Sequence, residues 1–452
     1  MASNLYHYKN GINEFEQNDF EQQKKSLSVF INKQFVSRNL VVFIGSGCSS
    51  EDIPLMSTTM RKILNDYDVV YKKVRQFLNS KNLDFLNNSI KSNHSWLEKK
   101  YENEEDKNRK DSLKTELRVS SNLLDLLEKN NKTSIEEFYN VRNQEHQEFL
   151  DDNFYKSFSD IESLLNWLQN GLNFSPNDSE LEEAIQTLKR EFIDTIPTLG
   201  SEVYQSGTTL STYQKFFQSV FKHRTELGSK VTIVTTNYDL FNEYALENNR
   251  IVYSTGFENN LHRKFNVNLF RNRVVDDTNR YKNVWQPTFK EANLLKIHGS
   301  INWTSDDNSI LIQRDQIMPD ESEVIIYPTM LKHKETAQAP YSELFREFAN
   351  ILQVPNTTLI VLGYGFPDEH INNIISQNLR NQDFNLIVFG DKEEDKMKRF
   401  FREFQGQEGF HLIGGEDVDN KTKAHYFKYL VDEIINYTLI EELGVTEENG
   451  DE

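Results

Sequence analysis

Short runs of apolar residues, separated by polar segments, recur along the chain. The first run, Leu40–Ile44, is apolar at every position, as in a strand that is buried on both faces of a parallel sheet. Later runs with this strand pattern are Val231–Asp239, Leu294–Trp303, Val324–Pro328, Thr358–Ile371 and Leu386–Asp391. Between some of these runs the apolar residues have helical spacing, as in Tyr341–Leu352. Residues 14–38, before the first run, have the same spacing. The alternation predicts an α/β fold with a Rossmann-like parallel sheet.

The segment from residue 57 to residue 230 has a different character. It is rich in Asn, Gln, Glu and Lys, and Ile161–Leu168 and Leu181–Phe192 have the spacing of amphipathic helices. We therefore predict a helical insertion over residues 57–230. The sheet domain would be discontinuous, formed by residues 1–56 and 231–452. The apolar faces of the inserted helices can pack on a core of their own or contact a partner, and the pattern favours neither.

Composition narrows the classes of protein. The formal net charge is −19, which argues against binding nucleic acid through a broad basic face. The single cysteine, Cys48, excludes a disulfide within the chain and a cysteine-based zinc cluster. The first residues carry no secretion signal, and no run approaches the roughly 20 apolar residues of a membrane span. We expect a cytoplasmic protein without a metal, a membrane segment or sequence-specific contacts to nucleic acid.

A glycine-rich loop follows the first predicted strand, with the sequence Gly45-Ser46-Gly47-Cys48-Ser49-Ser50. Glycines let the backbone approach a diphosphate, and the amides of a following helix can bind it. The same pattern also suits a tight turn without a ligand. Because no lysine follows to complete a P-loop, ATP hydrolysis at this loop is not expected.

Polar residues or glycines follow three other predicted strands. One strand ends at Thr235, Asn237 and Asp239, a second at His298, and a third at Gly363. Ligands of open parallel sheets bind outside the carboxyl ends of the strands, at the switch point of the strand order. The sequence therefore predicts a ligand site at this edge of the sheet.

The order of these motifs resembles that of the sirtuin family. Sirtuins carry a Gly-Ala-Gly-x-Ser loop followed by Ile-Pro, then Thr-Gln-Asn-x-Asp, a His-Gly dipeptide and a later Gly-Thr-Ser loop. The corresponding segments here are Gly45–Ser49 with Ile53-Pro54, Thr235–Asp239, His298–Ser300 and Gly363–Gly365. The resemblance spans the predicted sheet domain and leaves out the inserted region.

The departures from the family pattern point to one branch. Classical sirtuin deacylases carry a four-cysteine zinc ribbon, which a chain with one cysteine cannot form. The chain therefore resembles the divergent bacterial sirtuin-like branch of anti-phage defence, whose members hydrolyse NAD⁺, and above all its HerA-associated type. That resemblance implies NAD⁺ as substrate, a HerA-type ATPase or another defence-system partner, and assembly into a homo-oligomer.

The resemblance also implies roles for individual residues. Asn237 would contact the ribose and position the attacking water, and His298 would act as a general base or polarise the ribose hydroxyls. Asp239 would contact the nicotinamide carboxamide, and Gly363 would face the adenosine side. The remaining residues expected to bind the nucleotide are Gly45, Ser46, Gly47 and Ser49, at the diphosphate, together with Thr235.

Other interpretations of these residues stay open. Asn237 and Asp239 are also favoured residues for capping a helix that begins near Leu240. Cys48 has the chemistry of a nucleophile, but no histidine is near it in sequence, and a small buried side chain fits it better. For the whole protein, NAD⁺ hydrolysis in anti-phage defence competes with NAD⁺-dependent protein deacylation and with a non-catalytic nucleotide-binding subunit that regulates a partner ATPase. Sequence does not separate hydrolysis of NAD⁺ from its cyclisation.

Overall fold

The computed structural model describes residues 5–16, 18–79, 83–104, 107–129, 158, 161–222, 224, 229–281, 284–288, 290–305, 310–315, 340–380, 383–417 and 422–437. Contacts divide the chain into two compact units. The first unit, which we call the sheet unit, contains the described residues up to Ile53 and from Ile196 onward. The second, called the helical unit, runs from Pro54 to Thr195. The predicted insertion, residues 57–230, thus differs from the helical unit, because the described residues of 196–230 group with the sheet.

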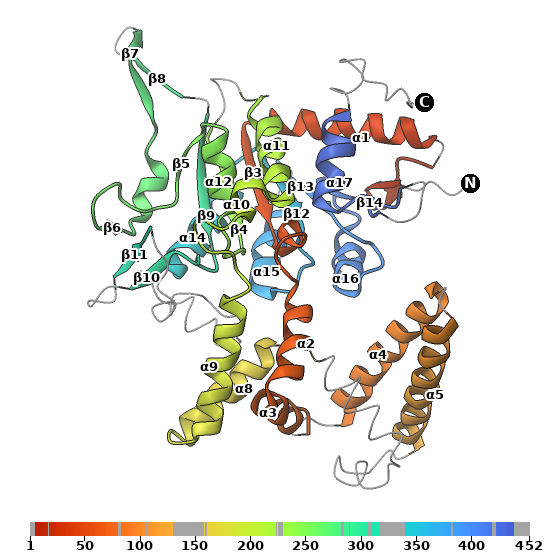
Figure 1. Cartoon of the computed structure of the whole chain (residues 1–452). Coiled ribbons are helices and arrows are strands. Elements are labelled where there is room, and N and C mark those ends of the chain that lie inside the picture. The colour runs from red at the N-terminus through yellow and green to blue at the C-terminus, as the bar shows by residue number, and fades with distance from the viewer. Residues whose placement is uncertain are drawn as a thin grey trace, which may run out of the picture. The chain divides into compact units, whose positions relative to one another are not determined.

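The main sheet of the described residues has nine strands (Figure 1). In spatial order they are β2 (Ile12–Asn13), β1 (Leu5–Lys9), β14 (Phe410–Gly415), β13 (Phe384–Phe389), β12 (Thr357–Leu362), β3 (Asn39–Ile44), β4 (Val231–Thr235), β9 (Glu291–Lys296) and β5 (Val252–Ser254). Neighbours from β14 to β5 are parallel, and β1 pairs antiparallel with β14 and β2. From β9 to β14 the chain order is 3-2-1-4-5-6, the order of the Rossmann fold. The predicted Rossmann-like sheet is confirmed.

Within the described residues, the predicted strands begin close to the observed ones, and all except Leu40–Ile44 end too late. The two runs predicted over Val231–Asp239 and Thr358–Ile371 stop as strands at Thr235 and Leu362, where the loops of the site begin. Polar and glycine residues in those runs belong to the loops. The predicted strand 324–328 lies outside the described residues.

The helix predicted over residues 14–38 begins later than expected. It is α1 (Phe20–Phe35), and Asp19 caps it by accepting a hydrogen bond from the Gln22 backbone, while the Gln22 side chain accepts from the Asp19 amide. This reciprocal capping box fixes the first turn. Residues 14–16, which the prediction placed in the helix, form a turn that follows the antiparallel strands β1 and β2.

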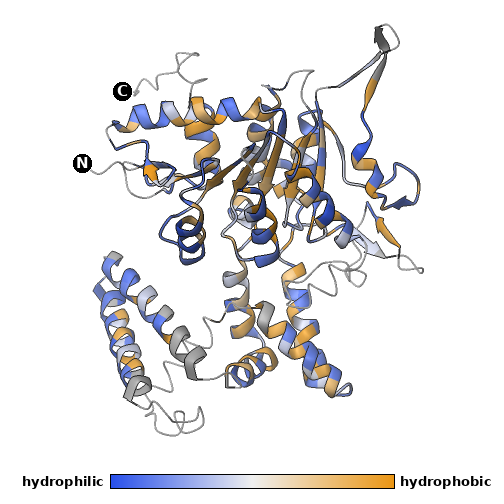
Figure 2. Cartoon of the chain, turned by 180° about the vertical axis from the view of Figure 1, so that it is seen from behind, coloured by the Kyte–Doolittle hydropathy of each residue, from blue (hydrophilic) through white to orange (hydrophobic). Residues whose placement is uncertain are grey.

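Two groups of helices cover the two faces of the sheet (Figure 1). The described helices of the sheet unit are α1, α10 (Val203–Ser206), α11 (Thr208–Lys222), α12 (Phe241–Asn248), α14 (Tyr341–Leu352), α15 (Glu369–Asn378), α16 (Asp395–Phe404) and α17 (Phe427–Tyr429), together with 3₁₀ turns at Ser46–Ser49 and Val267–Arg271 and a π-helix at Leu430–Ile435. Helices α14, α15 and α16 pack in one core with Val41 and Phe43. Because side chains alternate along a strand, Leu40 and Val42 face the other layer. The central strands of the sheet are accordingly mostly apolar (Figure 2).

Smaller strands extend the sheet unit. They are β6 (Arg263–Lys264), β10 (Trp303–Ser305) and β11 (Leu311–Gln313) in one sheet, and the hairpin β7 (Val275–Tyr281) and β8 (Val284–Pro287). Trp303 is buried in the core shared with α14, whereas Trp285 on β8 is exposed. The two tryptophans therefore differ in their surroundings.

The helical unit consists, in its described part, of amphipathic helices. They are α2 (Met56–Asp66), α3 (Asp68–Asn79), α4 (Leu83–Asn103), α5 (Lys107–Lys129), α8 (Ile161–Phe174) and α9 (Ser179–Ile193). Helices α2, α3, α8 and α9 pack around buried residues such as Ile63, Val74, Leu165 and Leu188, and α4 packs against α5. The apolar faces of α8 and α9 thus have a core of their own. Across the described residues, no helix is both long and apolar enough to cross a bilayer.

A hydrogen bond joins two parts of the sheet unit that lie on either side of the helical unit in sequence. Asp52, just before the helical unit, accepts it through Oδ2 from the Thr209 amide at 3.0 Å, at the start of α11. The segment before the helical unit is therefore fixed to the first helix of several turns that follows it.

Helix α11 belongs to the core of the sheet unit. The ring of Phe216 is almost fully buried and lies 6.0 Å from the Phe35 ring and 5.4 Å from the Phe427 ring. These edge-on contacts join α1, α11 and α17 in one layer.

We expect Phe216→Ala to lower the free energy of unfolding by about 3 to 5 kcal/mol, because it leaves a cavity between three helices. The control is Phe174→Ala, at a phenylalanine that is 90% exposed, which should change stability by less than about 0.5 kcal/mol. Chemical denaturation of both variants checks this. Equal effects would contradict the placement of α11 in the core.

A pair of buried histidines lies between β1 and β14. His7 Nε2 and His411 Nδ1 are 2.9 Å apart, and the Phe30 ring lies against both imidazoles. Burial lowers the pKa of His7 to about 3, with the charges of His411 and Lys9 adding to the effect. Burial, helped by Lys9, lowers the pKa of His411 to about 4. Both imidazoles are thus neutral in the folded chain at pH 7.

The pair should make stability depend on acid pH. Because both pKa values lie below the usual 6.5, the unfolded chain binds the protons first; the contribution is full above about pH 6.5 and is lost as pH falls through 4. In His411→Leu the free energy of unfolding should fall less steeply between pH 7 and pH 4.5 than in the wild type. His262→Leu, at an exposed histidine, should keep the wild-type slope. An unchanged slope in His411→Leu would contradict the assignment.

Candidate functional site

The loops after β3 and β12 touch backbone to backbone where the strand order reverses. The Gly45 amide donates to Leu362 O at 2.8 Å, and the Gly47 amide donates to Gly363 O at 2.9 Å. A Cβ on Gly45 would lie 2.4 Å from Gly363 O, and a Cβ on Gly363, at φ +59°, would lie 2.5 Å from Cys48 N. The close approach of the two loops therefore requires these glycines, with or without a ligand.

Most backbone amides at the start of the predicted diphosphate loop already donate hydrogen bonds within the protein, so few of them could bind a phosphate. It enters a short 3₁₀ turn, Ser46–Ser49, rather than an α-helix. Besides the two amides just described, the Cys48 amide donates to Gly45 O at 3.1 Å. Ser46 is exposed, and Gly47 is partly exposed, whereas Ser49 is buried and turned inward. The role of the loop in binding a diphosphate stays a prediction, and Ser46 and Gly47 are its accessible members.

Thr235 ties the end of β4 to the neighbouring loop. Its Oγ1 donates to Ile44 O at 2.7 Å and accepts from the Asn237 amide at 3.0 Å. The side chain is fully buried. The structure thus gives Thr235 a part in holding Asn237, and its expected contact with a nucleotide stays a prediction.

The Asn237 side chain is buried and held in one orientation. Its Nδ2 donates to Gly45 O at 3.1 Å and to Ser49 Oγ at 3.2 Å, and lies 3.5 Å from Tyr213 Oη. A backbone carbonyl can only accept, so the amide nitrogen, not the oxygen, must face Gly45. Oδ1 then points the other way, is buried, and has no hydrogen-bond partner among the residues that the structure describes. A buried acceptor without a partner is costly unless something else fills it.

Asp239 lies just before α12, next to a buried ion pair. Asp239 Oδ1 accepts a hydrogen bond from the amide of Phe241, the first residue of α12, at 3.1 Å. The N-cap position itself is Leu240, which has no side-chain cap, so neither Asn237 nor Asp239 occupies it. The Lys296 ammonium is fully buried, donates to Asp239 O, and pairs with Glu243 at 2.9 Å. Burial raises the pKa of Asp239 and that of Glu243, and the Lys296 charge opposes both shifts. The expected contact of Asp239 with a carboxamide stays a prediction.

His298 lies on the loop beside that of Asn237. Thr235 and Lys296 are paired in register on β4 and β9, and Asn237 and His298 each follow two residues later. Adjacent strands are about 4.8 Å apart, so the two side chains belong to neighbouring loops at one edge. His298 is mostly buried, and its Nε2 lies 3.4 Å from Asp368 Oδ2. A carboxylate at this distance orients the imidazole ring.

Cys48 has no sign of a nucleophile. The thiol is buried, and burial together with the nearby Asp239 raises its pKa well above the usual value. A thiol that keeps its proton is a poor nucleophile. Its place against Gly363 fits the small buried side chain that sequence favoured. Within the described ranges, no three His, Cys, Asp or Glu side chains are grouped as metal ligands.

Two residues near this site had no role in the sequence analysis. Tyr213 comes from α11, and its hydroxyl touches Ser49 and Asn237. Asp368 caps α15 and faces His298. Tyr213 lies in an ordinary amphipathic helix, so no local signal marks it. Asp368 stands five residues after Gly363, in a loop that the sequence did mark.

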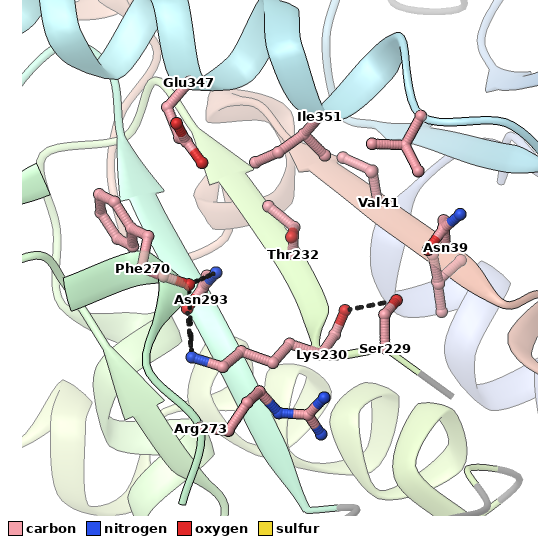
Figure 3. Close-up of a pocket in the computed structure, with 12 residues that line it drawn as sticks. Asn39, Val41, Ser229, Lys230, Thr232, Phe270, Arg273, Asn293, Glu347 and Ile351 are labelled. Carbon is pink, nitrogen blue, oxygen red and sulfur yellow. Dashed lines mark hydrogen bonds between the residues drawn. The ribbon is translucent and has the colours of Figure 1, made fainter. Parts of the chain in front are cut away.

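A separate hollow lies at the opposite edge of the sheet, near the amino ends of β3 and β4 (Figure 3). Lys230 contacts Asn293 at 3.2 Å and pairs with Glu291 at 3.2 Å, and Arg273 pairs with the same carboxylate at 2.7 Å. Burial lowers the pKa of Lys230, while Glu291 opposes that shift. Lys230 and Arg273 thus share the Glu291 carboxylate. Ligands of parallel sheets bind at the carboxyl ends of the strands, and this hollow lies at their amino ends. This hollow is therefore not the candidate site.

The fold and the site define a class of protein: a Rossmann-like sheet with polar side chains gathered at its switch point. A comparison with known protein families is consistent with this class. The SIR2-like domain family matches residues 231–410, and this match supports a sirtuin-like family for the chain. The SIR2-like domain includes Asn237, His298 and Gly363 and leaves out the Gly45 loop and α11. SIR2-like domains bind NAD⁺ and belong to families of NAD⁺-utilising enzymes. No curated protein matches the chain.

The contact between the two loops can be tested at Gly363. We expect Gly363→Ala to destabilise the chain by more than about 1 kcal/mol, because the new Cβ meets backbone and φ is positive. Gly406→Ala is the matched control, since nothing lies within 4 Å of its Cβ position, and it should stay within about 0.5 kcal/mol of wild type. Thermal or urea unfolding measures both, and a Gly363→Ala variant as stable as Gly406→Ala would refute the contact.

Proposed function

We propose that the protein is an NAD⁺ hydrolase that cleaves NAD⁺ to nicotinamide and ADP-ribose. The SIR2-like domain supports the substrate. Support for the chemistry comes from the paired positions of Asn237 and His298 at the carboxyl edge of the sheet. The observation that carries the proposal is the Asn237 Oδ1 atom, a buried acceptor at the switch point that has no partner in the described part of the chain.

The reaction needs such an acceptor. Water forms a bond from its oxygen to the anomeric carbon of the nicotinamide ribose, and the bond from that carbon to the pyridinium nitrogen breaks. The bonding pair goes to the nitrogen, which loses its positive charge, and one proton of the water is released. Asn237 Oδ1 would accept a hydrogen bond from the attacking water or from a ribose hydroxyl, and so hold the nucleophile in line.

His298 would take the released proton or polarise a ribose hydroxyl. An imidazole titrates near neutral pH, which suits either task. Asp368, at 3.4 Å from Nε2, would stabilise the imidazolium that forms. The loop residues Ser46 and Gly47 would lie toward the diphosphate.

The proposal extends to the cell. We propose that the hydrolase depletes NAD⁺ on phage infection, as a cytoplasmic homo-oligomer that works with a HerA-type ATPase or another defence partner. The resemblance of the motif order to the sirtuin-like defence branch supports this part of the proposal.

The test is NAD⁺ consumption by the purified chain, alone and with its co-expressed genomic neighbour. Asn237→Ala and His298→Ala should each lower turnover by about a hundredfold or more, because each removes a group from the reacting centre. Asn260→Ala and His262→Ala, at exposed residues of the same types, should retain wild-type turnover. Free nicotinamide and ADP-ribose are measured by chromatography, which also separates a cyclic product.

Two results would overturn the proposal. NAD⁺ binding without turnover in every preparation would favour the nucleotide-binding subunit. Nicotinamide release only in the presence of an acylated peptide would favour the deacylase.

A further inference from the structure

We propose that Tyr213 is a positioning residue that sets the orientation of the Asn237 amide, an inference that rests on the proposed function. Tyr213 lies on α11, outside the region that matches the SIR2-like domain. The site would then be completed by a helix that the sequence assigned to the insertion.

The hydroxyl of Tyr213 closes a small network of hydrogen bonds. Tyr213 Oη lies 3.0 Å from Ser49 Oγ and 3.5 Å from Asn237 Nδ2, and Ser49 Oγ itself lies 3.2 Å from Nδ2. Because Nδ2 only donates, the two hydroxyl oxygens accept from it. The Tyr213 proton is then available to Ser49 Oγ. The network joins the loop after β3, the loop after β4 and α11 at one amide.

The network decides which atom of Asn237 faces outward. Gly45 O, Ser49 Oγ and Tyr213 Oη all gather on the nitrogen side of the amide. Each contact lowers the energy of the orientation in which Oδ1 points away from the loop. If the hydroxyl of Tyr213 is lost, Ser49 Oγ loses one contact and keeps those with Asn237 and Asp239, and the Asn237 amide keeps fewer restraints.

The position of Tyr213 itself is fixed by packing. The side chain is fully buried, and its ring lies 5.7 Å from the Phe241 ring and 5.0 Å from the Phe427 ring. Burial also raises the pKa of the Tyr213 hydroxyl well above the usual value, so it stays protonated at any working pH. A rigid, neutral hydroxyl is suited to position a neighbour and unsuited to proton transfer.

The chain offers a matched control in Tyr204. This tyrosine is also buried and also lies against the Phe241 ring, at 4.9 Å. Its hydroxyl accepts from the Leu240 amide at 3.0 Å and donates to Pro197 O at 3.1 Å. Tyr204→Phe and Tyr213→Phe thus each remove one buried hydroxyl near the start of α12, and only the second touches the Asn237 network.

The experiment compares the steady-state kinetics of NAD⁺ hydrolysis in the two full-length variants. We expect Tyr213→Phe to lower kcat by about tenfold or more with KM close to wild type, because a misplaced amide harms the reacting geometry more than binding. Tyr204→Phe should lose as much thermal stability as Tyr213→Phe and keep wild-type kcat. An unchanged kcat in Tyr213→Phe, or an equal loss in both variants, would overturn the proposal.

A second readout keeps this inference apart from the proposed function. The side-chain amide resonance of Asn237, assigned by its loss in Asn237→Ala, should shift in Tyr213→Phe and stay in place in Tyr204→Phe. If the wild type does not turn over NAD⁺ but the resonance shifts, the proposed function fails and the positioning role stands. If NAD⁺ is hydrolysed and the resonance does not move in Tyr213→Phe, the positioning role fails alone.

Discussion

The close contact between the backbones of two loops is the constraint on which the site depends. Where the strand order reverses, the loops after β3 and β12 approach until Gly45 and Gly363 leave no room for a Cβ. This contact sets the direction of Gly45 O, and that carbonyl in turn selects the nitrogen of the Asn237 amide. The glycines of the two loops therefore have two explanations. One is the close packing of the loops in the structure, and the other is the nucleotide that the resemblance to sirtuins implies.

A buried polar layer lies behind that contact and holds the loop after β4. Thr235 binds it to the end of β3, and Lys296 binds the Asp239 backbone while pairing with Glu243. Removing one partner of such a pair leaves a buried charge, which is far more costly than the pair is stabilising. The loop that carries Asn237 is thus held by two buried side chains, Thr235 and Lys296, which are both shielded from solvent.

Sequence predicted the parallel strands well, because strands buried on both faces are apolar at every position, as Leu40–Ile44 is. It missed β14 and β1, where a histidine and glycines interrupt the pattern and the partner is an antiparallel edge. The positions of Asn237 and His298 at neighbouring strand ends follow from motif order and from the rule for parallel sheets. What could not be predicted was where the Ser49 side chain points and what Tyr213 touches, since their contact joins segments 164 residues apart. The boundary of the insertion was unpredictable for the same reason: α11 differs from its neighbours only in what it packs against.

The hydrogen bond between Asp52 and Thr209 has a consequence for how such a chain can change over evolutionary time. It joins Asp52, which lies just before the helical unit, to α11, which follows that unit along the chain. The entropic cost of closing a loop between two fixed points rises only with the logarithm of its length. Segments of very different size can therefore be exchanged between these two points at similar cost, while the strand order and the network around Asn237 stay as they are. The sheet unit is in this sense a frame that can remain constant while the inserted segment changes.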